Sequence, residues 1–343
     1  MKNHSSIRSL LVVTAIVTCA TTTFAQSVVT NLPESDAVAT VNMRRIVNET
    51  LPRLLTAAQM TGLQSALAKA KQIAGFDISN IESAVVGLRL NRSAPLTMPS
   101  MLFVMRGSFN ADALVSLLKV GLSGKTHDEK YGTKTLTLLK MGDLMQSGGS
   151  RAGSPAIEIA IVALDGSTIA AGIPAYVKAA VDADGGKNRI KPELVQLIGR
   201  EPDSLIRIAG LVPPGFFARL LPKESQGNEE IARLAGSIEQ IYIGLNMEAQ
   251  AFPLSLMLKA NTAENAHAIA GFLQSIAQFG INVKDKNFKS IVDALKITSQ
   301  ETEVQVRTVL PQDMVASFVR SLLSPPAKSV EMKSPPKPET KKP

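Results

Sequence analysis

The chain repeats part of itself once, in the same order, and this repeat constrains its fold more than any other feature. The apolar segment Ile81–Leu88 returns as Ile238–Leu245. Two weaker matches keep the order: Asp36–Val41 with Asp203–Ile208, and Ile173–Pro174 with Leu310–Pro311. The separation between the copies decreases along the chain, as it would if the second copy had shorter loops. We therefore predict two similar units in tandem, over residues 26–185 and 203–323, joined by a connecting segment at 186–202.

Both units have the pattern of α+β structure, each an antiparallel sheet packed with helices. Short apolar runs bounded by turn residues predict strands, and Asp165-Gly166 between two such runs predicts a hairpin because glycine tolerates the positive φ of the turn. Asn110 and Thr262 are placed to cap helices. A helix over 44–74 is expected to bury an apolar stripe, made of Leu51, Leu54, Leu55, Ala58, Leu63, Leu67 and Ala70.

The first 25 residues have the composition of a signal peptide. Lys2 and Arg8 precede a short apolar run, and Thr23–Ala25 offers small residues for cleavage after about Ala25. The expected location is periplasmic or secreted, with a retained leader acting as an anchor as the alternative. Lipidation of Cys19 is less favoured, because Thr18 stands where processing boxes prefer Gly, Ala or Ser.

The charge and composition of the chain limit the classes of partner that it can bind. The formal charge is +8, but the leader contributes two positive charges, and five Lys against two Glu lie in the Pro/Lys-rich tail at 324–343. The folded part is left only weakly basic, which excludes a nucleic-acid interface. We expect the tail to be disordered and to make at most weak, salt-sensitive contact with an anionic envelope.

Several short motifs imitate catalytic or binding sites without the partners such sites need. Gly124-Lys125-Thr126 follows a predicted helix instead of opening one, so it is not a phosphate loop. Ser116 and Lys119 lack the companion motifs of penicillin-recognising enzymes. The remaining imitations are incomplete in the same way: Asp182, Asp184 and Glu193 as a calcium loop, Gly148, Gly149 and Gly153 as a dinucleotide loop, and His127 and His267 as metal ligands.

These absences lead us to expect no catalytic, cofactor-binding or metal-binding residues and no cofactor. Five methionines, by contrast, gather around one predicted sheet, where they either fill the core or line an adaptable apolar pocket. They are Met98, Met101, Met105, Met141 and Met145.

Four segments carry a resemblance to known proteins: Pro33-x-x-Asp36, Gly75-x-Asp77-Ile78-x-x-Ile81-Glu82, Gly107-Ser108-Phe109 and the Asp165-Gly166 hairpin. In these the chain resembles a group of uncharacterised exported bacterial proteins with tandem α+β units. The resemblance implies a fold and an exported location, but no substrate, cofactor or site residue.

The sequence favours an exported, non-enzymatic binding or structural protein of the cell envelope, acting through contacts with an envelope protein or surface. The alternative is a carrier of an apolar small molecule or lipid, held in a cleft between sheet and helices. A carrier predicts a large apolar cavity, whereas a contact protein predicts an exposed apolar patch or a bare sheet edge.

Overall fold

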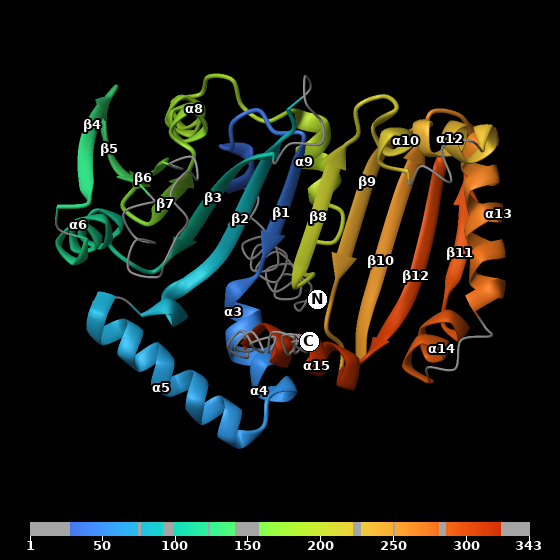
Figure 1. Cartoon of the computed structure of the whole chain (residues 1–343), viewed down its shortest axis with the longest axis horizontal. Helices are drawn as coiled ribbons and strands as arrows, with labels where there is room; N and C mark the ends of the chain where they lie inside the picture. The colour runs from blue at the N-terminus through green and yellow to red at the C-terminus, as the bar shows by residue number, and fades with distance from the viewer. Residues whose placement is uncertain are drawn as a thin grey trace, which may run out of the picture.

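The computed structural model describes residues 28–74, 77–91, 99–122, 124–140, 158–221, 228–249, 251–280 and 286–323. Within them the strands form one antiparallel sheet of twelve, in the order β11-β12-β10-β9-β8-β1-β2-β3-β7-β6-β5-β4 (Figure 1). The strands are β1 (Ala37–Val41), β2 (Ile81–Arg89), β3 (Ser100–Gly107), β4 (Thr126–Tyr131), β5 (Lys134–Lys140), β6 (Glu158–Asp165), β7 (Thr168–Gly172), β8 (Ile206–Leu211), β9 (Ile238–Leu245), β10 (Ala251–Ala260), β11 (Lys296–Gln300) and β12 (Glu303–Pro311).

Helices connect the strands and cover parts of both faces. They are α3 (Met43–Arg45), the π-helix η1 (Ile46–Thr50), α4 (Leu51–Leu54), α5 (Ala57–Ala74), the 3-10 helix η2 (Ile78–Asn80), α6 (Ala111–Gly121), α8 (Pro174–Asp184), α9 (Pro192–Ile198), α10 (Phe216–Leu220), α12 (Glu229–Gly236), α13 (Ala263–Gly280), α14 (Lys286–Asp293) and α15 (Gln312–Leu323). The expected fold class, an antiparallel sheet packed with helices, is confirmed. No helix among the described residues is long and apolar enough to cross a bilayer.

The middle of the sheet is the pairing of β1 with β8, two strands far apart in the sequence. Ala37 lies opposite Gly210, and Val41 lies opposite Ile206. From this pair the order runs outward as β1-β2-β3-β7-β6-β5-β4 on one side and as β8-β9-β10-β12-β11 on the other. The sheet is therefore continuous across the two halves of the chain, and the division into tandem units stays a prediction.

The sheet has two faces that are covered differently, and we name them by the residues they carry. Face A carries Val38 and Ala209, and face B carries Ala39 and Ile208, as the alternation along paired strands requires. On face A, α8 packs on β3, β6 and β7 and α9 packs on β1 and β8, and together they bury the largest core cluster. On face B, α13 covers the opposite half, where it packs on β10, β11 and β12.

Several local predictions agree with this structure. The Asp165-Gly166 turn joins β6 to β7. The side chain of Asn110 accepts from the backbone N–H of Ala113 at 2.9 Å, and Thr262 caps α13 through the N–H of Asn265 at 3.2 Å. The leader and the tail lie outside the described residues.

The helix expected over 44–74 is interrupted, and much of its apolar stripe is not buried. After α4 the chain turns at Leu55, whose ψ of 145° is extended, and α5 then lies beyond the ends of the strands (Figure 1). Leu54 and Leu55 are buried, but Leu63 and Leu67 are partly exposed and Ala58 is fully so. A buried stripe on α5 is therefore wrong, because that helix packs mainly on α6 and does not reach the sheet.

Candidate functional site

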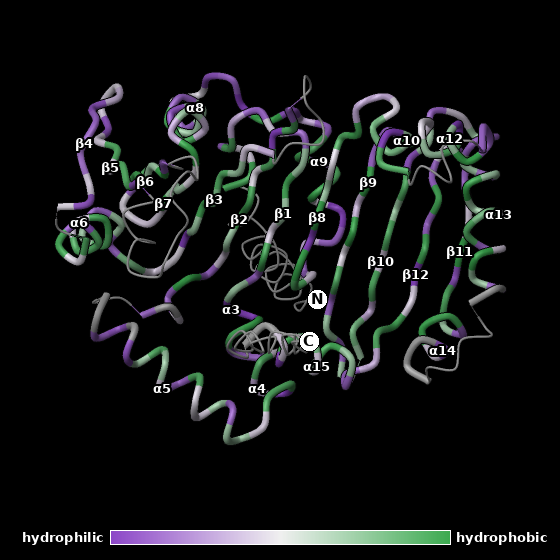
Figure 2. Tube along the Cα trace, in the orientation of Figure 1, coloured by the Kyte–Doolittle hydropathy of each residue, from purple (hydrophilic) through white to green (hydrophobic). Residues whose placement is uncertain are grey.

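The centre of face B is an apolar surface over which no helix of the described residues packs. Register places ten apolar side chains on this area, which we call the apolar floor: Ala39, Val41, Ala84, Val86, Met101, Phe103, Met105, Ala171, Ile208 and Ile243. All ten retain solvent exposure, and Phe103 is 46% exposed. The apolar side chains that the same strands carry on face A are buried instead, and Val38 and Leu102 are 0% exposed there. Figure 2 shows how apolar these central strands are.

Elements at the margins frame the floor without covering it. On one side, α6 packs against β6 through a small cluster that includes Ala111 and Ile169. On the other side lies α13, over β10 to β12. At the end of the strands, α4 and α15 close a third cluster around Leu54, Phe252 and Ala316. An apolar patch that retains solvent exposure and is bordered by other elements is typical of a binding surface.

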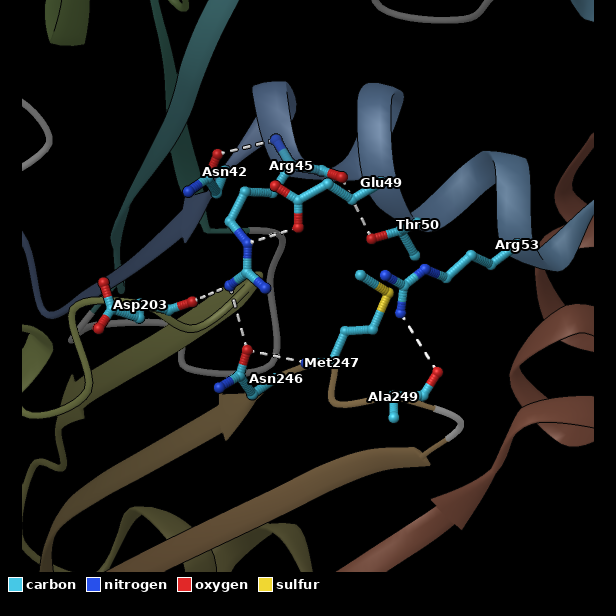
Figure 3. A network of polar contacts seen from close by, with 9 residues as sticks. All are labelled: Asn42, Arg45, Glu49, Thr50, Arg53, Asp203, Asn246, Met247 and Ala249. Carbon is cyan, nitrogen blue, oxygen red and sulfur yellow. Dashed lines mark hydrogen bonds and ion pairs between the residues drawn. The ribbon is translucent and has the colours of Figure 1, made fainter.

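A network of polar contacts holds the helices at that end in place (Figure 3). The guanidinium of Arg45 donates to the backbone carbonyl of Asp203 and, at 3.1 Å, to Oδ1 of Asn246. Its Nε lies 3.1 Å from Oε2 of Glu49, one turn further along the helix. Because Asp203 and Asn246 flank β8 and β9, this arginine attaches the first helices of the chain to the opposite half of the sheet.

A second arginine extends the network to α15. Arg53 donates from Nη1 to the carbonyl of Ala249 at 3.2 Å (Figure 3). Its own carbonyl accepts from the side-chain amide of Gln312 at 3.1 Å. Segments from the start, middle and end of the described chain thus meet here, which fixes the border of the apolar floor.

The sequence-predicted residues fall into two groups. Met101 and Met105 lie on the apolar floor on either side of Phe103, as an adaptable apolar surface would require. Met98, Met141, Met145 and the glycines 148, 149 and 153 lie outside the described residues.

The imitation motifs form no site in the structure. His127 is exposed on β4 and His267 is exposed on α13, and the described residues contain no cluster of His, Cys, Asp or Glu that could hold a metal ion. Gly124 has a φ of +78°, as expected for a turn after a helix. Asp182 accepts from the hydroxyl of Tyr131 at 2.9 Å, and Gly185 caps α8.

Sequence reasoning did not identify two features of the sheet, namely the exposure of face B and the buried arginine of face A. The exposure of face B depends on which helix packs on which strand, and no local pattern encodes this. Arg207, buried within β8, had a visible signal, because a lone charge interrupts an otherwise apolar run.

Neither a protein-family model nor a curated protein matches the sequence. Solved structures of a protein named TP0453 are similar in fold. Its crystal form III matches over 87% of this chain and 98% of that chain, with 10% identity and a TM-score of 0.48. Its crystal form I matches over 86% and 97%, with 11% identity and a TM-score of 0.47.

Proposed function

We propose that the chain is an exported, non-enzymatic binding protein whose apolar floor receives an apolar segment of a partner protein. The observation that supports this is the contrast between the apolar side chains of the same strands, which are buried on face A and retain solvent exposure on face B. Burying Phe103 and its neighbours would release water from apolar area at about 25 cal/mol per Å². The outer strands of the sheet suit this function less, because β4 carries Asp128, Glu129 and Lys130, and charged edges resist strand addition.

A photo-crosslinking residue in place of Phe103 tests the proposal in cells that export the protein. We expect a crosslinked product of protein size. The matched control places the same residue at Val120, which is 74% exposed on α6 and lies outside the apolar floor. Equal crosslinking at both positions, or none at position 103, would contradict the proposal.

The second candidate is a carrier of an apolar small molecule or lipid, favoured by the two methionines on the floor and by its bordering helices. The crosslinking experiment separates the two candidate functions, because an adduct of lipid size at position 103 would favour the carrier. Native mass spectrometry of the exported protein is the second measurement. Extra mass released on denaturation, and lost in a Phe103→Ser variant but not in Val120→Ser, is the carrier's expected result.

A further inference from the structure

On face A, three arginines from three separate segments line one cavity of about 370 Å³. Arg207 comes from β8, Arg106 from β3, and Arg44 from α3, directly after the end of β1. The hydroxyl groups of Thr40 and Ser83 belong to the same lining, and Glu82 is its one carboxylate among the described residues. The strand residues Thr40, Ser83 and Arg207 of this lining lie on face A, and Val41, at the end of β1, is the one residue that the lining shares with the apolar floor. The inference depends on the arginines and not on the floor.

Arg207 is the buried member of this cavity, with 8% of its surface exposed. Its Nε donates to the hydroxyl of Thr40 at 3.0 Å, and its Nη1 donates to the carbonyl of Ile198 at 3.1 Å, at the end of α9. Both acceptors are neutral. No carboxylate among the described residues lies within ion-pair distance of this guanidinium, although the charge of Asp203 reaches it. Burial accordingly lowers the pKa of Arg207.

The second terminal nitrogen of Arg207 is available to a ligand. Nη2 has no hydrogen-bond partner among the described residues. No buried side-chain nitrogen or oxygen in that part of the chain lacks a partner, so Nη2 keeps contact with solvent, and Arg207 lines the cavity. A guanidinium that is largely desolvated and offers free N–H groups favours a negatively charged partner.

The other charges around the cavity leave it positive. Arg44 is exposed and makes no ion pair or hydrogen bond with any described residue. The charge of Arg106 also acts on Asp165 and helps to lower the pKa of that carboxyl group. Glu82 already accepts a hydrogen bond from Ser108 at 2.8 Å. Arg207 and Arg44 alone outnumber the one carboxylate of this lining, so the cavity keeps a positive charge that an anion would neutralise.

We infer that this cavity binds an oxyanion of the phosphate class, either free phosphate or the phosphate ester of a headgroup. Arg207 supplies the desolvated guanidinium and Arg44 the exposed one, and the hydroxyls of Thr40 and Ser83 complete a polar wall. Arginine is suited to this ligand because its planar fork matches two phosphate oxygens at once.

Isothermal titration calorimetry of the full exported chain tests the inference, with inorganic phosphate as the probe and ionic strength held constant with chloride. We expect saturable binding that Arg44→Gln weakens about tenfold, since one charged hydrogen-bond partner is lost. Glu82→Gln should tighten binding, because it removes the repelling carboxylate. Glycerol 3-phosphate in parallel identifies the source: tighter binding than inorganic phosphate assigns a headgroup ester, and weaker binding assigns the free ion.

Arg307→Gln is the matched control, because Arg307 is equally exposed but lines other cavities. The affinity of the Arg307→Gln variant for phosphate should equal that of the unaltered chain. No saturable binding, or equal weakening by Arg44→Gln and Arg307→Gln, would overturn the inference. Arg44 is exposed and makes no hydrogen bond or ion pair with a described residue. Arg44→Gln therefore tests the cavity without altering a buried position on which folding depends.

Discussion

Gly107 ends β3 where the pairing with β2 becomes irregular, opposite Ile81. A Cβ at this position would overlap the backbone carbonyl of Asn80 and lie 2.9 Å from the Cα of Ile81. Because backbone atoms cannot move aside cheaply, Gly107→Ala should lower the free energy of unfolding by about 3 kcal/mol. Gly62, in the exposed helix α5, has nothing within 4 Å, and Gly62→Ala should raise stability by about 0.5–1 kcal/mol. Urea unfolding of both variants measures these differences, and equal effects would contradict the assigned geometry.

Two buried tyrosines make the free energy of unfolding depend on pH in the alkaline range. Burial raises the pKa of Tyr176, whose hydroxyl lies 2.6 Å from that of Ser35, and of Tyr242, each to about 12. Between pH 10 and 12 the folded chain therefore keeps protons that the unfolded chain has lost. This contribution to stability is complete below pH 10 and is lost as the pH rises toward 12.

Urea unfolding between pH 9 and 11 measures this dependence, and tyrosinate absorbance reports the ionisation directly. We expect stability to fall above pH 10, and the slope to be smaller in Tyr176→Phe. A tyrosinate titration with an ordinary midpoint near 10 in the folded protein would contradict the prediction.

At the scale of elements, Arg45 fixes α3, η1 and α4 to the ends of β8 and β9. Arg45→Gln removes its donors to Asp203 and Asn246 and its ion pair with Glu49, which should cost about 1–2 kcal/mol. Hydrogen exchange should also increase in α4 and α15, because both border the same cluster. Arg44→Gln, next in sequence and without these contacts, is the control. Unchanged exchange in α4 would show that the apolar cluster alone holds this helix.

Elements with a local signal could be predicted from the sequence, and elements defined by distant partners could not. The Asp165-Gly166 hairpin and the Asn110 cap depend on residues next to each other, so their patterns were sufficient. In β4 the charged residues Asp128 to Lys130 mask the strand, because it lies at the edge of the sheet, where both sides meet water. The short helix α9 lies in the segment expected only to connect the units, where Pro192 opens it and Leu194 is buried.

The candidate site, too, could be predicted from the sequence only where a local pattern indicated it. Periodicity indicated an apolar stripe on α5 but not whether any element would cover it. The methionines 101 and 105 indicated an apolar surface, yet its exposure depends on α6 and α13 lying at opposite margins of face B. Arg207 required knowledge of the β1–β8 pairing, because only that pairing places Thr40 beside it.

At the scale of the whole molecule, the two halves should unfold together. The core cluster on face A joins Val38 and Leu102 from one half to Tyr242 and Met257 from the other. Five consecutive residue pairs join β1 to β8 within the same sheet. We expect a single calorimetric transition whose van't Hoff and calorimetric enthalpies agree. Two resolved transitions would instead favour independent tandem units.

The pairing of β1 with β8 also bears on how the chain folds as it is synthesised. Strand β2 follows β1 closely and can occupy one side of it early. The other side waits for Ile206, which is added about 165 residues after Val41 and thus on the order of ten seconds later. During that interval β1 presents an unsatisfied edge to every other nascent chain nearby. Its length of five residues keeps this edge short, which limits mispairing until its partner arrives.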